Sequence, residues 1–268
     1  MNTAFTQAKR IVIKVGSSSL TYESGNINIR QIEKLCKILA DIKNSGREVV
    51  LVSSGAVAVG ASKMGLHHKP ATIPEKQAAA AVGQCELMYI YDKQFLEYHH
   101  KVAQVLLTRD NIDHPERRRN AVNTFETLLQ MGCIPIVNEN DTVAVDEIKI
   151  GDNDTLSAHV ASLIHADGLI LLSDIDGLFE RNPHEDPQAP IIRHVGVIDE
   201  HIHQIAGGAG SNRGTGGMAT KIAAAEICFE AGCAMAIINS NRLEGLYDLL
   251  EGREIGTIFE KKENSFTK

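Results

Sequence analysis

Short runs of β-branched and aliphatic residues alternate along the chain with longer stretches whose apolar residues recur at helical spacing. The short runs predict buried strands at 11–15, 48–52, 102–107, 134–137, 168–172, 234–238 and 257–259. The longer stretches predict helices at 29–45, 75–98, about 120–131, 155–164, 218–231 and near 243–250. The run 191–195 is a candidate hairpin or edge strand. Repeated strand and helix predict an α/β fold with a mainly parallel sheet covered on both faces.

Glycine and serine residues mark the predicted turns and breaks between these elements. Polar or small-residue turns are expected at 16–19 and 53–56, and Gly46 is expected to close the helix 29–45 as its C′ residue. Gly83 lies within the Ala-rich helix 75–98, where it costs about 1 kcal/mol relative to alanine, so close packing or a kink is expected there. The segment 206–217 holds six glycines among twelve residues and is predicted to be irregular until a ligand binds it.

The composition narrows the class of protein. A chain of 268 residues is long enough for one large α/β domain or two small ones. The longest apolar runs are shorter than a membrane span, and the first ten residues lack a secretory signal. The five cysteines are scattered without a Cys-x-x-Cys pair, which argues against a disulfide framework or a structural zinc site and favours the cytoplasm. The net charge of −7 disfavours nucleic acid as the main partner.

Polar residues follow four separate predicted strands. They are, in chain order, Lys14 with Gly16, Ser54 with Gly55, residues 138–141, and Ser173 with Asp174. In open parallel sheets, ligands bind beyond the carboxyl ends of the strands. Together these residues predict a binding site at that edge of the sheet.

An acidic turn, Gly151-Asp152-Asn153-Asp154, precedes the helix predicted at 155–164. Because Asp and Asn are good N-caps and suit the helix dipole, a well-capped surface helix is one interpretation. In a second interpretation, the acidic turn acts chemically together with Lys14 and Lys221. Both lysines lie in Gly-, Ser- and Thr-rich turns far away in the sequence. The Asp154 carboxylate could accept from both ammonium groups and limit their repulsion.

Lys221 lies in the first turn of the helix predicted at 218–231, where a cation opposes the dipole, and a bound phosphate would explain its presence. Known phosphate loops do not match: Gly55 and Gly60 have the Walker spacing but are followed by residues 61 and 62, which are Ala and Ser. Phosphoryl transfer needs mainly positioning and charge stabilisation. A carboxylate acceptor, with an unperturbed pKa of about 4, is already ionised and needs no general base.

Ordered motifs between Arg10 and Phe259 resemble those of the glutamate 5-kinases, a group within the amino-acid kinase superfamily. The motifs are Lys14-Val15-Gly16-Ser17-Ser18, Ser53-Ser54-Gly55-Ala56, Val82-Gly83-Gln84, Leu106-Leu107-Thr108, and residues 136–141, 150–154 and 214–221. Related aspartate and N-acetylglutamate kinases typically have a second glycine after the one that follows the lysine. Here Ser17 follows Gly16, which favours free glutamate as the acceptor.

The resemblance implies a single domain over 1–268, built as a three-layer α/β/α sandwich. Its glutamate-binding half would be about 1–165 and its nucleotide-binding half about 166–268. The implied reaction transfers the γ-phosphoryl group of ATP to the side-chain carboxylate of L-glutamate, giving L-glutamyl 5-phosphate in the first step of proline biosynthesis. Mg²⁺ is the implied cofactor and proline the implied feedback inhibitor, and a homo-oligomer, dimer or tetramer, is expected.

The resemblance also assigns residues to roles, motif by motif. Lys14, Lys221 and Asp154 would be catalytic, and Ser54, Asp141 and Asn153 would bind glutamate. No residue is assigned as a metal ligand. The implied nucleotide site comprises Lys14, Ser173, Asp174, Thr215, Gly216, Gly217, Met218, Ala219, Thr220 and Lys221.

Two departures from the family pattern are visible. Many members carry a further C-terminal RNA-binding-like domain, whereas this chain ends at Lys268, and Asn182-Pro183 stands where the family usually has Asp-Pro. Two other functions stay open. One is a kinase of the same fold that phosphorylates aspartate, N-acetylglutamate or a nucleoside monophosphate, and the other is a non-catalytic nucleotide or amino-acid sensor.

Overall fold

An eight-stranded sheet forms the centre of the molecule. The computed structural model describes residues 3–66, 68–143, 152–183, 185–207 and 217–261. Within them the strand order is β3-β4-β2-β1-β5-β9-β10-β8, and each neighbouring pair is parallel except β9 with β10. The strands are β1 (Arg10–Val15), β2 (Glu48–Ser53), β3 (Val102–Leu107), β4 (Ile134–Glu139), β5 (Gly168–Ser173), β8 (His194–Val195), β9 (Ala234–Asn239) and β10 (Thr257–Phe259). The prediction of a mainly parallel sheet is confirmed.

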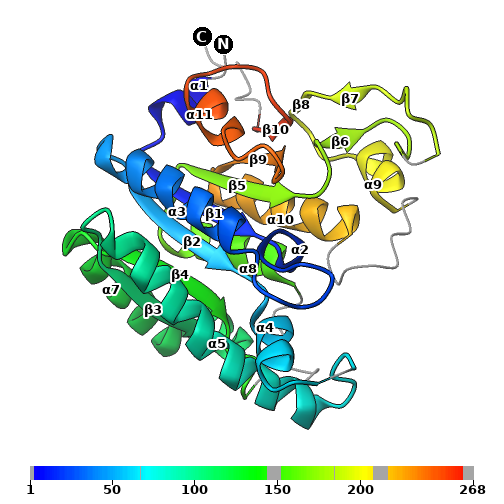
Figure 1. Cartoon of the computed structure of the whole chain (residues 1–268). Helices are drawn as coiled ribbons and strands as arrows, with labels where there is room; N and C mark the ends of the chain where they lie inside the picture. Colours follow the sequence, from blue (N-terminus) through cyan, green and yellow to red (C-terminus); the bar gives the residue numbers. More distant parts are fainter. Residues whose placement is uncertain (1–2, 67, 144–151, 184, 208–216, 262–268) are drawn as a thin grey trace.

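Helices cover both faces of this sheet, so the fold has three layers (Figure 1). One hydrophobic layer packs α1 (Thr3–Gln7), α2 (Ser17–Leu20), α3 (Ile29–Asn44), α4 (Ala56–Lys63), α5 (Ile73–Leu96) and α11 (Gly245–Leu250). The other packs α6 (Arg109–Asp113), α7 (Pro115–Gln130), α8 (Asn153–Leu163), α9 (Glu200–Gly207) and α10 (Met218–Ala231). Side chains of a strand point alternately to opposite faces. Accordingly, Ile11 and Ile13 of β1 join the first layer and Val12 the second.

The central strand β1 sets the position of the site. It pairs with β2 on one side and β5 on the other, with Lys14 opposite Val52 and Leu171. The strand order therefore reverses beside β1, because β2, β4 and β3 extend one way and β5 and β9 the other. In open α/β sheets such a switch point leaves a crevice at the carboxyl ends of the strands.

Helices α4 and α5 approach each other so closely that only glycine fits between them. A Cβ atom on Gly83 would lie 1.8 Å from the carbonyl oxygen of Ala56, and one on Gly60 would lie 1.7 Å from that of Ala79. The close packing predicted at Gly83 is confirmed, and its partner is Gly60.

Several local predictions need correction. The turn expected at 16–19 contains the short helix α2, and the helix expected at 120–131 begins earlier, at Pro115, because proline suits the first helical position. The irregular stretch expected at 206–217 starts inside α9, which ends at Gly207, and residues 208–216 lie outside the described residues.

The run 191–195 is both a hairpin strand and an edge strand. Ile191 and Ile192 form β7 (Ile191–Ile192), which pairs antiparallel with β6 (Leu178–Phe179), and β8 pairs with β10 at the sheet edge. Helices α1, α4, α6 and α9 were not predicted, because each has eight residues or fewer and is too short to show a helical pattern over several turns. Across the described ranges, every helix is too short or too polar to span a bilayer.

Candidate active site

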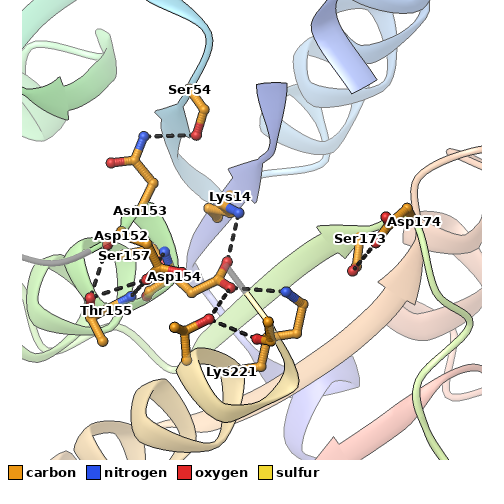
Figure 2. Close-up of polar contacts among 12 residues, drawn as sticks. Lys14, Ser54, Asp152, Asn153, Asp154, Thr155, Ser157, Ser173, Asp174 and Lys221 are labelled. Carbon is orange, nitrogen blue, oxygen red and sulfur yellow. Dashed lines mark hydrogen bonds and ion pairs between the residues drawn. The ribbon is translucent and has the colours of Figure 1, made fainter. Parts of the chain in front are cut away.

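Asp154 lies between the two lysines at the carboxyl edge of the sheet (Figure 2). Its Oδ1 atom is 2.6 Å from Nζ of Lys14, and its Oδ2 atom accepts a hydrogen bond of 3.0 Å from Nζ of Lys221. Asp154 is fully buried, and the two lysines are 9% and 7% exposed. Two ammonium groups are thus held at one carboxylate while each keeps donors for an anion.

Three separate elements supply these side chains. Lys14 follows Ile13 in β1, so it points to the face of the sheet on which α8 and α10 pack. Asp154 is in the first turn of α8 and Lys221 in the first turn of α10. The helix starts converge because α8 and α10 pack against each other.

The charge of Asp154 follows from its neighbours. Burial raises the pKa of this carboxyl group, but Lys14 and Lys221 outweigh burial, so its pKa lies below the ordinary value. Asp154 is therefore ionised at neutral pH. Thr220 adds a third contact, because its Oγ1 atom lies 3.2 Å from Asp154 Oδ2 and donates to the carbonyl oxygen of Gly217 at 2.8 Å.

A chain of amide contacts fixes the orientation of Asn153. The two N–H groups of its Nδ2 atom share three acceptors, which are the Ser53 carbonyl oxygen at 3.1 Å, Ser54 Oγ at 2.7 Å and Asn138 Oδ1 at 3.0 Å. Asn138 in turn donates from Nδ2 to Gln84 of α5 at 3.0 Å. Since a carbonyl only accepts, the amide nitrogen of Asn153 must face Ser53 and its oxygen must point away.

Asp152 was not among the predicted site residues. Its Oδ1 atom caps α8 by accepting from the backbone amides of Asp154 and Thr155, each at 3.1 Å. Its Oδ2 atom is buried and, within the described part of the chain, accepts no hydrogen bond. The residue lines both clefts of the site. The acidic turn was a visible signal in the sequence, but the capping role alone explained Asp152 there.

Two clefts meet at this centre. The larger, about 1180 Å³, is lined by Lys14, Ser173, Asp174, Gly217, Met218 and Lys221 among others, and the smaller, about 790 Å³, by Ser54, Asp141 and Asn153 among others. Ser17, Ser54, Asp152 and Asn153 line both, so the clefts adjoin. Gly55 shapes the smaller cleft with a φ of 97°, which favours glycine.

The structure places most of the predicted nucleotide-site residues around the larger cleft. Ser173, the last residue of β5, donates from Oγ to the Asp174 carboxylate at 3.2 Å. Ala219 is exposed, and Thr220 contacts Asp154. Thr215 and Gly216 lie outside the described residues.

Comparison with known proteins agrees with this architecture. The sequence profile described as the amino acid kinase family matches residues 9–239. Carbamate kinase from Giardia lamblia bound to AMP-PNP superposes with a TM-score of 0.69 at 18% identity, covering 96% of this chain and 100% of that one. An isopentenyl phosphate kinase superposes with a TM-score of 0.66, also at 18% identity, covering 93% of this chain and 99% of that one. The chain therefore belongs to the amino acid kinase family.

Relatives with higher identity narrow this assignment. Glutamate 5-kinase of Clostridium perfringens (strain 13 / Type A) is 53% identical over 267 residues, which cover 98% of this chain and 99% of the relative. Glutamate 5-kinase of Enterococcus faecalis (strain ATCC 700802 / V583) is 52% identical over 265 residues, which cover 97% of this chain and 98% of that relative. Within the family, the chain is thus similar to glutamate 5-kinases along nearly its whole length.

Proposed function

We propose that this protein is an ATP-dependent kinase that phosphorylates the side-chain carboxylate of L-glutamate, giving L-glutamyl 5-phosphate and ADP. The observation that carries the proposal is the buried Lys14–Asp154–Lys221 arrangement where the two clefts meet. Similarity to glutamate 5-kinases over nearly the full length supports the choice of acceptor. On the basis of the resemblance to glutamate 5-kinases, we assign the reaction to the first step of proline biosynthesis.

In this proposal the transferring phosphoryl group passes between the two lysines. Negative charge spread over its oxygens is stabilised by Lys14 and Lys221, both of which line the larger cleft. Asp154 keeps both ammonium groups in place and offsets their repulsion in a buried environment, where an unpaired charge would be costly. The glutamate carboxylate attacks as the anion, so no side chain has to remove a proton.

The smaller cleft would take glutamate. Ser54, Asp141 and Asn153 keep their predicted roles in this proposal, and Asp152 joins them. The outward-facing amide oxygen of Asn153 accepts hydrogen bonds, and the carboxylate of Asp152 adds negative charge beside it, so the two residues suit the α-ammonium group of a free amino acid. An N-acylated acceptor has only one N–H to offer them, which argues against N-acetylglutamate.

The larger cleft would take the nucleotide, with Ser173, Asp174 and the start of α10 around it; Thr215 and Gly216 are assigned by motif. Mg²⁺ commonly binds through one or two carboxylates together with substrate phosphates. Among described residues, no group of three His, Cys, Asp or Glu side chains could hold a metal. Asp174 lines the cleft and is available as one carboxylate ligand. A bound Mg²⁺ would neutralise phosphate charge.

Three further expectations stay predictions. One is a single domain with its glutamate-binding half near 1–165 and its nucleotide-binding half near 166–268. Another is inhibition by proline, whose amine and carboxylate would compete for the cleft that takes glutamate. The third is assembly into a homodimer or homotetramer.

ADP release tests the proposed reaction. Mg·ATP is incubated with glutamate, aspartate, N-acetylglutamate or no acceptor, and proline is added to the active mixture. We expect release that depends on glutamate and falls with proline. Release with another acceptor alone would retain the kinase and discard the acceptor assignment. ATP binding without release under any condition would support a sensor instead.

Replacing Asp141 with alanine should raise the glutamate KM by about tenfold to a hundredfold, because a charge-assisted hydrogen bond to the substrate is lost. The turnover number should change much less, since Asp141 does not contact the Lys14–Asp154–Lys221 centre in the proposed mechanism. Steady-state kinetics at saturating ATP measure both constants. Asp92→Ala, at an exposed position of α5, is the matched control. An unchanged KM in Asp141→Ala would remove this residue from the acceptor site.

A further inference from the structure

The smaller cleft is lined by charged groups of both signs. Its acidic residues are Glu23, Glu139, Asp141 and Asp152, and its lysines are Lys69 and Lys76. Glu139 ends β4 and Asp152 caps α8, whereas both lysines belong to α5 or to the segment that leads into it. The acidic and basic groups therefore come from different elements around one cavity. A zwitterionic ligand can be complementary to both sets at once, as a purely cationic or anionic ligand cannot.

Lys76 occupies an unfavourable position in its own helix. The helix α5 begins at Ile73, with Thr72 as its N-cap, so Lys76 lies in the first turn, where the helix dipole repels a cation. Lys221 has the same placement at the start of α10, and there the buried carboxylate of Asp154 accounts for it. Across the described ranges, Lys76 has no carboxylate partner of this kind.

The neighbouring acid does not supply the missing partner. Glu75 completes a capping box, accepting through Oε2 from the backbone amides of Ala71 at 3.0 Å and Thr72 at 3.1 Å. These backbone hydrogen bonds lower the pKa of Glu75, so its negative charge is stabilised by the backbone amides at the helix start. Lys76 lines the cavity, and the Glu75 carboxylate beside it already accepts from the backbone. Lys76 can therefore bind an anion that occupies the cavity.

Lys76 and the other lysine of the cleft, Lys69, differ in their exposure to solvent. Lys69 is exposed, and an ion pair made there would be screened by solvent. Lys76 is partly buried, so part of its hydration is already lost and an anion bound to it is screened less.

None of the residues assigned to glutamate so far supplies a positive charge for its α-carboxylate. Its side-chain carboxylate must lie near Lys14 to be phosphorylated, and its ammonium group suits Asp152 and Asn153. We propose that the ammonium group of Lys76 binds the α-carboxylate of the acceptor and makes the cleft selective for amino acids in which that carboxylate is free. The assignment rests on the proposed function, which identifies the acceptor as an amino acid.

Lys76→Met tests this assignment, because methionine keeps an unbranched apolar stem and removes the charge. Two ligands are compared at saturating Mg·ATP: glutamate, through its KM, and 4-aminobutanoate, through its inhibition constant against glutamate. The second compound retains the amine and the reacting carboxylate but lacks the α-carboxylate. Lys93→Met, in the last turn of the same helix and exposed, is the matched control. Lys76→Arg restores the charge, and thermal unfolding reports whether each variant is folded.

We expect the glutamate KM of Lys76→Met to rise about thirtyfold, while the inhibition constant of 4-aminobutanoate stays within about twofold. The arginine variant should recover part of the loss, and the lysine 93 control should match the unaltered protein. An unchanged glutamate KM, or equal weakening of both ligands, would overturn the assignment. If the unaltered chain shows no glutamate-dependent ADP release, the proposed function itself fails and this assignment falls with it.

Discussion

Replacing Lys221 with methionine should lower the turnover number by about 10³-fold, which corresponds to about 4 kcal/mol of lost transition-state stabilisation. In the proposed mechanism, Lys221 neutralises charge on the phosphoryl group while it is transferred, and methionine cannot. Glutamate affinity should change little, because Lys221 lines the larger cleft and not the smaller one. The measurement is kcat and both KM values under saturating Mg²⁺.

Loss of folding must be separated from loss of catalysis in this variant. Asp154 would keep its ion pair with Lys14, so its buried charge would still be compensated. The thermal midpoint of Lys221→Met should therefore stay close to that of the unaltered protein. Lys34→Met removes a partly exposed lysine that pairs with Glu244 and should leave turnover unchanged. A folded Lys221→Met variant with a tenth of the normal turnover would contradict the catalytic role.

Replacing Gly83 with alanine should lower the free energy of unfolding by about 3 kcal/mol or more. The added Cβ atom would lie 1.8 Å from the carbonyl oxygen of Ala56 and 2.6 Å from the amide nitrogen of Gly60, so α4 and α5 would have to move apart. Alanine gains about 1 kcal/mol over glycine in a helix, but this gain is smaller than the cost of separating two backbones. Urea denaturation gives the midpoint and slope that measure the change.

Gly207→Ala is the control for this substitution. Gly207 ends α9, and no atom of the described residues lies within 4 Å of the position its Cβ would take, so the change should be neutral or slightly stabilising. Moving α4 would also displace Ser54, which lies just before it, so the glutamate KM of Gly83→Ala should rise as well. A Gly83→Ala variant as stable as Gly207→Ala would contradict the close approach of the two helices.

Most of the large elements could be predicted from the sequence because their signals are local. The helix 218–231 was predicted with the bounds it has, since glycine stands on either side of it and Gly232 takes the left-handed conformation, with a φ of 69°, that ends a helix. The strand 102–107 was likewise predicted with its observed bounds. Short elements such as α2 gave no such signal, because four residues make one turn and its stability comes from packing, with Leu20 fully buried.

The candidate site was predicted only in part. Lys14, Asp154 and Lys221 could be named because each is a charged residue at a strand end or helix start, and their catalytic roles stay predictions. Asp152 was missed because one oxygen of its carboxylate has an ordinary capping role, and only the folded chain leaves the other buried and free. Lys76 was missed because it lies on an ordinary helical stretch, far in sequence from the other residues around the cleft.

The sequence by itself determined an α/β protein with a mainly parallel sheet and a polar carboxyl edge, because strand, helix and turn preferences act over a few neighbouring residues. Only the tertiary structure decided which groups meet at that edge. Lys14 and Lys221 come to one carboxylate because β1 is central and because α8 packs on α10. Such contacts join residues far apart in the chain, and their geometry depends on the register and packing of the whole sheet.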